Sequence, residues 1–322
     1  MSIALIVSIA GLLILVILHE LGHFFFAKKF GVKVEEFGIG IPWSPKIFSK
    51  KIGETTYSLY PLLIGAFVRL EGEETTIDSP RSFRAKPIWQ RFTIVAGGVG
   101  VFWAIAIIIF SLLGATSGIP LPVTDDITDQ THNPKVQILA VAPDSPAQEA
   151  GILFEDTILS LEAGEEKIEE VTKTKAVQEF TQLHKGEEII ITIERKGEIE
   201  QVALTPRVDP PEGQGAMGVA LMRTAFVQYA WYEAPYRGTV LTLQLTVDIV
   251  QQFGFLIKNL IVPAPDAPST QISGPVGLIN QLQNVFNAGI PHFIAWMALL
   301  SIYLAIFNTI PIPALDGGQM FF

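Results

Sequence analysis

The chain has 322 residues, of which 49% are hydrophobic and 17% are charged, and its mean hydropathy is +0.40. This composition argues against a water-soluble protein and favours one that lies in a lipid bilayer. Cysteine is absent, which excludes a disulfide framework, a thiolate metal site and a cysteine nucleophile. The net charge of −10 comes without a basic face, so a nucleic-acid partner is disfavoured.

Two long apolar segments occupy the first third of the chain. Residues 3–26 carry no charge before His19, and residues 92–113 contain nothing more polar than serine and threonine hydroxyls. About 20 helical residues cross a hydrocarbon core roughly 30 Å thick, so each segment predicts a transmembrane helix. The first segment lacks a basic start and a small-residue cleavage site, which predicts a retained helix and not a signal peptide.

Basic residues surround the connection between these two segments. They are Lys28, Lys29, Lys33, Lys46, Lys50 and Lys51 on one side and Arg81, Arg84, Lys86 and Arg91 on the other. The positive-inside rule therefore predicts that residues 27–91 are cytoplasmic. Within them, residues 34–70 alternate short apolar stretches with Gly and Pro, which indicates a membrane-associated β-hairpin beside the first helix. A small cytoplasmic sheet is the alternative.

The middle of the chain resembles a soluble domain. We expect a strand at residues 136–141, a short helix at residues 145–150 and an alternating strand at residues 188–195, within one compact α+β domain. Most of the acidic residues lie between Asp125 and Glu212, which the predicted topology places on the side of the membrane opposite the basic connection.

The C-terminal part contains two further apolar segments. Charged and amide side chains interrupt residues 236–262, which favours an interfacial helix, whereas residues 293–310 predict a third transmembrane helix. The fold class is therefore a multi-span α-helical membrane protein with three clear transmembrane helices, an interfacial helix, the β-hairpin and an inserted α+β domain. The predicted divisions are residues 1–118, 130–222 and 232–322.

The run His19-Glu20-Leu21-Gly22-His23 carries the chemistry. Two histidines four residues apart lie about 40° apart on one face of a helix, where both imidazoles can bind one zinc ion. Glu20 between them can take a proton from a bound water. Ionisable residues within a transmembrane segment are costly and indicate function, because a cluster that only joins helices does not need this spacing.

A catalytic zinc commonly has three protein ligands, so a third is expected elsewhere. Glu35, Glu36 and Glu54 are candidates, as is Asp316. Asp316 follows the third predicted span and reaches the cytoplasmic side if that span runs opposite to the second, so we favour it. Taken alone, its Leu-Asp-Gly-Gly run also fits a turn that ends a helix with the acid as a cap.

These residues resemble the site-2 proteases, a family of membrane-embedded zinc metallopeptidases, and in particular its bacterial regulator-of-sigma-E type. The resemblance covers almost the whole chain. It rests on His19-Glu20-Leu21-Gly22-His23, the Gly-rich segment at residues 37–70, Lys86-Pro87-Ile88-Trp89-Gln90-Arg91, Ser273-Gly274-Pro275-Val276-Gly277, and Asn308-Thr309-Ile310-Pro311-Ile312-Pro313-Ala314-Leu315-Asp316-Gly317. The first and last of these are the specific ones.

The resemblance implies that zinc is the cofactor, with His19, His23 and Asp316 as ligands and Glu20 as the general base. It further implies that Asn308, Pro311 and Pro313 help to hold an unwound substrate segment. Residues 136–158 look like part of a PDZ domain, so the middle domain is expected to be one.

The same resemblance implies regulated cleavage of single-span membrane proteins, such as anti-sigma factors or signal-peptide remnants. The expected location is the bacterial inner membrane, surrounded by lipid, with the PDZ domain extracytoplasmic and able to take a peptide or protein ligand.

The chain departs from the family pattern in two places. The second span contains Gly97-Gly98-Val99-Gly100-Val101, where the family usually shows Gly-Pro and a nearby Asn. The family also continues past the Leu-Asp-Gly motif into a further helix, which we expect to be missing here. Two other functions compete with proteolysis: a non-catalytic membrane scaffold that binds partners through its PDZ domain, and a metal transporter, for which one histidine pair and one acid are sparse.

Overall fold

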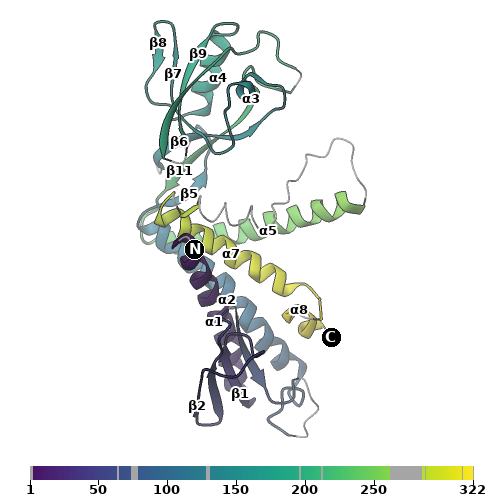
Figure 1. Ribbon diagram of the computed structural model, residues 1–322. Coiled ribbons are helices and arrows are strands. Elements are labelled where there is room, and N and C mark those ends of the chain that lie inside the picture. The colour runs from purple at the N-terminus through teal and green to yellow at the C-terminus, as the bar shows by residue number, and fades with distance from the viewer. Residues whose placement is uncertain are drawn as a thin grey trace. The chain divides into compact units, whose positions relative to one another are not determined.

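The structure is a computed structural model that describes residues 3–63, 65–73, 79–127, 131–195, 197–211, 213–261, 285–286, 288–313 and 315–321. The chain forms two compact units (Figure 1). The first, here called the membrane unit, combines Met1–Leu112 with Ala234–Phe322, and the second, the soluble unit, is Leu113–Glu233. The two ends of the sequence thus build one body. The motif at residues 273–277 lies outside the described residues.

Four helices in the described part of the chain are long and apolar enough to cross a membrane. They are α1 (Ile3–Lys29), α2 (Ile88–Ala115), α5 (Ala234–Ile261) and α7 (Ile290–Thr309). Three of them contain the predicted transmembrane segments. Length and composition also allow α5 to span, although we predicted an interfacial helix there; its mean hydropathy of 1.5 is the lowest of the four.

The helices of the membrane unit pack through apolar side chains and a few polar links. A buried cluster joins Leu15 of α1, Phe102 of α2 and Met297 of α7. The Ser301 hydroxyl donates to the Phe102 carbonyl at 2.8 Å, and the Trp103 indole donates to the Thr246 hydroxyl at 3.2 Å. Such hydrogen bonds between helices help to fix their packing where lipid offers no polar partner.

A four-stranded sheet lies against the last turns of α1 and corrects the predicted hairpin. Its strands are β1 (Val34–Ile39), β2 (Phe48–Ile52), β3 (Thr55–Leu59) and β4 (Ala66–Leu70), in the order β2-β3-β1-β4. Only β2 and β3 form a tight hairpin, whereas β1 pairs parallel with β3 and antiparallel with β4. The prediction was wrong here because periodicity identifies strands but not which strands pair.

The soluble unit is built on a seven-stranded sheet. Six of its strands follow the order β10-β9-β7-β6-β11-β5, and the seventh, β8, pairs with β7. The strands are β5 (Ile119–Pro122), β6 (Thr131–Val141), β7 (Thr157–Ala163), β8 (Glu166–Ile168), β9 (Ile189–Arg195), β10 (Glu198–Leu204) and β11 (Val219–Val227), and the helices are α3 (Pro146–Glu149) and α4 (Thr174–Leu183). The predicted strands in β6 and β9 and the predicted helix at α3 are confirmed.

The core of this unit follows from the alternation of buried and more exposed residues along its strands. Ile189, Ile191 and Ile193 of β9 are fully buried, while the residues between them are more exposed, so one face of the strand lies on the core. Ser145 caps the N-terminus of α3, because its hydroxyl accepts a hydrogen bond from the Gln148 amide at 3.2 Å.

Helix α4 has no cap of its own, because Lys173 makes no side-chain hydrogen bond there. The carboxylate of Asp125, which follows β5, supplies it. This carboxylate accepts from the Thr174 amide at 3.1 Å, the Thr174 hydroxyl at 2.8 Å and the Lys175 amide at 2.8 Å. Burial alone would raise the pKa of Asp125, but the hydrogen bonds from Lys175 and Thr174 hold that pKa below its ordinary value.

Replacing Asp125 with Ala should therefore loosen the start of α4. A lost cap costs about 0.5–2 kcal/mol, so we expect the first-turn amides of α4 to exchange roughly 2- to 30-fold faster with deuterium in the full-length protein. Asp126→Ala, at the exposed neighbouring position, is the control. Because the folded pKa of Asp125 is depressed, the difference between wild type and variant should be present at neutral pH and shrink as the pH falls through that pKa. Equal exchange rates at neutral pH would contradict the capping role.

Candidate metal centre

His19 and His23 project from one face of α1 into the membrane unit. Both are buried, with exposed fractions of 6% and 8%. Their rings meet edge to face with centroids 4.6 Å apart, and the two Nε2 atoms are 3.2 Å from each other. The spacing of four residues therefore brings two imidazole nitrogens to one point, as the sequence predicts.

Asp316 completes the group from the far end of the chain. It is the first residue of α8 (Asp316–Phe321), and its Oδ2 atom lies 3.1 Å from His19 Nε2 and 3.4 Å from His23 Nε2. Among the residues that the structure describes, His19, His23 and Asp316 form a group whose candidate ligand atoms all lie within 4.8 Å of one another. The structure thus brings together the three residues that we predicted to bind zinc.

The three atoms fit a tetrahedral metal ion. With zinc–nitrogen and zinc–oxygen bonds of about 2.0–2.2 Å, two ligand atoms of a tetrahedron lie about 3.3–3.6 Å apart. The observed separations of 3.1, 3.2 and 3.4 Å lie at or just below the short end of this range. Within the described part of the chain, Asp316 Oδ2 is buried and has no hydrogen-bond partner, which is expected of an atom whose partner is a cation.

The backbone of α2 orients His23. Its Nδ1 atom is 3.1 Å from the Ile94 carbonyl oxygen, and because a carbonyl only accepts, Nδ1 carries the hydrogen and donates. Nε2 is then left with its lone pair facing Asp316, as metal-binding histidines require. On the other side, the His19 ring stacks on Phe102 of α2, with centroids 4.5 Å apart and planes 10° from parallel.

Glycines allow α1 and α2 to approach this closely. A Cβ atom added at Gly22 would lie 2.6 Å from the Gly97 carbonyl oxygen and 2.8 Å from the Gly98 Cα atom. One added at Gly98 would lie 2.2 Å from His23 Nε2. The absence of side chains here is what leaves room for the imidazole between the helices.

Glycines also permit the tight return from α7 into α8. A Cβ at Gly317 would lie 2.3 Å from the Ile310 carbonyl oxygen, and one at Gly318 equally close to the Ile312 carbonyl oxygen. Pro311 follows α7, which a proline cannot continue without losing a hydrogen bond. The Leu-Asp-Gly-Gly run therefore begins a helix at Asp316, whereas the alternative interpretation placed a helix end there.

The remaining predicted site residues occupy distinct places. Glu20 lies between the two histidines on α1, and the backbone N–H of Val68 in β4 donates a hydrogen bond to its carboxylate. Asn308 lies in the last turn of α7, where its amide donates to the Leu304 carbonyl at 3.0 Å. Pro311 and Pro313 are exposed in the connection from α7 to α8.

The other acids considered as third ligands lie outside the metal group, and two of them are held elsewhere. The buried Glu36 carboxylate pairs with Lys46 and Arg69 and accepts from the Tyr60 hydroxyl. Burial tends to raise the pKa of Glu36, but the hydrogen bonds from Lys46, Ser58 and Tyr60 lower it. Glu54 pairs with Lys28 and Arg81, both at 2.8 Å, and these cations lower its pKa. Glu36 and Glu54 are thus held in ion pairs of the sheet and its surroundings.

Several residues that shape the site were not identified from the sequence. The Ile94 carbonyl acts through its backbone, so its side chain carries no signal, and Phe102 reads as an ordinary apolar residue of a span. One feature of the sequence could have indicated the close packing of α2 on α1: the cluster Gly97-Gly98-Val99-Gly100. We interpreted it as a departure from the family pattern and not as a packing requirement.

Apolar helices long enough to span and a buried His/His/Asp group together fit a membrane protein with a metal site. Comparison with known proteins makes the class specific, because the family model described as Peptidase family M50 matches residues 7–322. The chain therefore belongs to peptidase family M50.

Relatives match along nearly the whole chain. A protein of Clostridium perfringens is 33% identical over 309 residues, which cover 95% of this chain and 83% of that protein. Zinc metalloprotease RasP of Oceanobacillus iheyensis is 25% identical over an alignment of 402 residues, which covers 96% of this chain and 87% of that protein. RasP of Geobacillus kaustophilus is 27% identical over an alignment of 392 residues, which covers 96% of this chain and 86% of that protein. The protein is a zinc metalloprotease of the membrane, and zinc is its cofactor.

The close crossing of α1 and α2 can be tested with two glycines. Gly22→Ala places a methyl group against backbone atoms that cannot rotate away, and overpacking of this kind costs about 1–3 kcal/mol. We expect a lower thermal unfolding temperature of the membrane unit in detergent and a lower zinc content. Gly100→Ala is the matched control, because nothing lies within 4 Å of a Cβ added there. Equal behaviour of the two variants would show that the crossing does not depend on Gly22.

Proposed function

We propose that the protein is an intramembrane endopeptidase of the site-2 type, in which His19, His23 and Asp316 hold the zinc ion and Glu20 is the general base. The observation that carries the proposal is the convergence of three buried ligand atoms, 3.1–3.4 Å apart, next to a carboxylate on the same helix. A structural metal site has no need of this additional carboxylate, so Glu20 speaks against a scaffold that only binds metal.

The chain's own residues divide the chemistry among them. Bound zinc supplies a Lewis acid that lowers the pKa of a coordinated water and polarises the scissile carbonyl. Glu20 accepts the proton from the attacking water and returns it to the leaving amide nitrogen. The Val68 amide holds the Glu20 carboxylate in place, and the Ile94 carbonyl keeps the His23 ring in the tautomer that offers Nε2 to the metal.

We further propose that the substrate is a single-span membrane protein, of the anti-sigma-factor or signal-peptide-remnant kind. A transmembrane helix hides its carbonyls in its own hydrogen bonds, so it must unwind before cleavage. The connection from α7 to α8 supports a role in holding the unwound segment, because Pro311 and Pro313 are exposed there and lie three to five residues before Asp316 in sequence. Asn308 lies in the last turn of α7, just before this connection.

The soluble unit would serve as a PDZ domain on the extracytoplasmic side of the bacterial inner membrane, within the predicted domain at residues 130–222. One edge of β11 supports a peptide-binding role. β5 pairs with only Thr224–Val227 of that edge, and the Val123 amide adds one bond to the Arg223 carbonyl. The preceding residues of β11 are open to strand addition by a peptide or protein ligand. Size filtering of substrates by this unit is the other proposed role.

Association of the four-stranded sheet with the lipid is also a proposal. Trp43, Ile47 and Phe48 are 84%, 63% and 59% exposed at or just before the outer strand β2, and Ile52 at its end is 58% exposed. Lys50 and Lys51 accompany them on β2. Aromatic and basic residues mixed in this way are typical of the membrane–water interface, on the side that the basic connection marks as cytoplasmic.

The proposed roles of Glu20 and the histidines can be separated by experiment. We expect Glu20→Gln to abolish cleavage of a tagged single-span substrate by the purified protein in detergent, with zinc retained, because the variant loses the base and keeps the ligands. His23→Ala should lose both zinc and cleavage. His132→Ala, on an exposed part of the soluble unit, is the control and should keep both. Cleavage by Glu20→Gln at the wild-type rate would refute the assignment.

A further inference from the structure

Asp316 depends on a very short helix. Helix α8 has six residues, about one and a half turns, and helices of that length are not stable alone in water. Its apolar anchor is Met320, which packs against the buried clusters of α1 and α2. Close contacts of Gly317 and Gly318 with the backbone after α7 add to this anchor. None of these packing contacts is directional, yet the position of the Asp316 carboxylate depends on the rotation of α8 about its axis.

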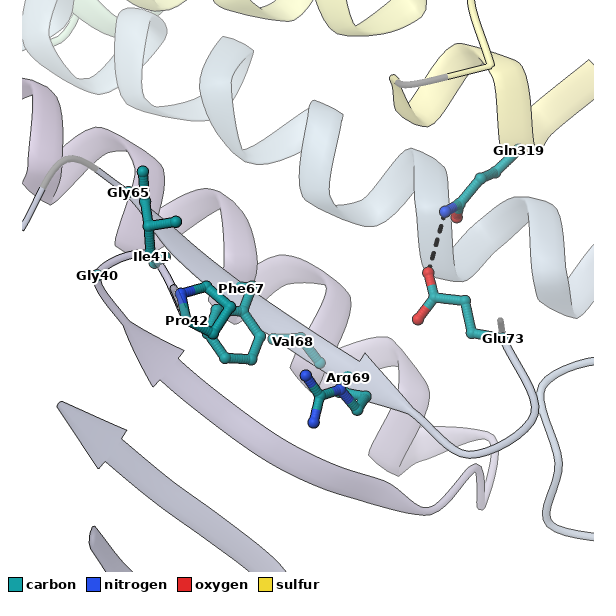
Figure 2. Close-up of a pocket in the computed structure, with 10 residues that line it drawn as sticks. Gly40, Ile41, Pro42, Gly65, Phe67, Val68, Arg69, Glu73 and Gln319 are labelled. Atoms are coloured by element: carbon teal, nitrogen blue, oxygen red, sulfur yellow. Dashed lines mark hydrogen bonds between the residues drawn. The ribbon is translucent and has the colours of Figure 1, made fainter. Parts of the chain in front are cut away.

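A polar link on the same face of α8 supplies the missing constraint. Gln319 lies three residues after Asp316, so both side chains leave the helix on one side. The Gln319 amide donates to Oε1 of Glu73 at 3.0 Å (Figure 2). Any rotation of α8 that draws Asp316 away from the imidazoles also breaks this hydrogen bond.

Glu73 is itself tied to the frame that carries the histidines. Its other carboxylate oxygen accepts from the Leu70 amide of β4 at 3.3 Å. The neighbouring Glu71 pairs with the Lys33 ammonium, and its amide donates to the Lys33 carbonyl at 3.0 Å, four residues after the end of α1. The contacts therefore form a closed path from α1 through β4 and Glu73 to α8 and back to the histidines.

The pair also lines a cavity. A cavity of about 380 Å³ follows β4 from Gly40 and Gly65 past Phe67 and Arg69 to Glu73 and Gln319. In Figure 2 the two hydrogen-bonded side chains lie at the end of this row, between the sheet and α8. The link thus lies where the edge of the sheet meets the helix that begins with Asp316.

We propose that Glu73 and Gln319 are a positioning pair, which fixes the rotation of α8 and so holds Asp316 at the metal. The inference rests on the proposed role of Asp316 as a ligand. Neither residue is a member of the metal group, and each acts through α8. Gln319→Glu would place two carboxylates together, drive α8 away and weaken zinc binding by about five- to tenfold. Glu73→Gln keeps a neutral hydrogen-bonding pair and should stay within about twofold of wild type.

The direction of the effect separates positioning from simple electrostatics. An added carboxylate near a cation site strengthens cation binding through Coulomb attraction, so Gln319→Glu would bind zinc more tightly if α8 did not move. Positioning predicts the opposite sign. The exchanged pair, Glu73→Gln with Gln319→Glu, restores one amide and one carboxylate and should recover zinc affinity to within about twofold of wild type.

The experiment is zinc competition against a chromophoric chelator, with the purified full chain in detergent, together with thermal unfolding of the metal-free proteins. Gln178→Glu, the same change at an exposed position of α4 in the soluble unit, is the control. Gln319→Ala, which removes the hydrogen bond without adding charge, is a second variant in case Gln319→Glu does not fold, and should weaken binding about two- to threefold.

Wild-type or tighter zinc binding by Gln319→Glu, or no recovery in the exchanged pair, would overturn the proposal. His19→Ala tests the metal site independently. If that variant binds zinc as wild type does, the proposed function fails; if it loses zinc while the Gln319 variants keep wild-type affinity, only the positioning pair fails.

Discussion

Polar side chains buried in an apolar helical bundle need partners, and this constraint organises the membrane unit. His19 and His23 lie on a helix long enough to span the bilayer, and both are buried. An ionisable group without a partner in such surroundings costs several kcal/mol. Here the Asp316 carboxylate comes within 3.1–3.4 Å of both imidazoles from the opposite end of the chain, and a cation held between the three side chains would be the partner of all of them. The proposed zinc ligands are thus also a folding constraint on the first and last helices.

The rest of the membrane unit provides the framework for that contact. Gly22 lets α2 approach α1 closely enough for the Ile94 carbonyl to orient His23. The sheet lies on the other side, where β4 reaches Glu20 through the Val68 amide. Helix α8 is held by two contacts: Met320 packs on the apolar cluster, and Gln319 donates to Glu73 just after β4. Helix α2 therefore orients His23, β4 contacts Glu20 and α8 carries Asp316. The packing of these elements on one another sets the distances between the site residues.

The soluble unit follows a different principle. Its stability comes from a conventional core on one face of a sheet, with Ile138, Ile158 and Leu161 almost fully buried. Two polar residues hold its ends together: the buried Arg223 donates to the carbonyls of Thr172, Thr124 and Ile127, and the half-buried Asp125 caps α4. None of these contacts involves the metal group of the membrane unit.

The sequence by itself determined the elements and the chemistry. Apolar runs of spanning length give α1, α2 and α7 because the bilayer requires them, and the four-residue spacing of His19 and His23 places both on one face through helical geometry alone. What only the tertiary structure decided are relations between distant segments: the pairing of β1 with both β3 and β4, the approach of Asp316 to the two histidines, and the Ile94 carbonyl behind His23. Periodicity reports the face of a single element, whereas pairing and ligand choice depend on which surfaces meet when the chain packs.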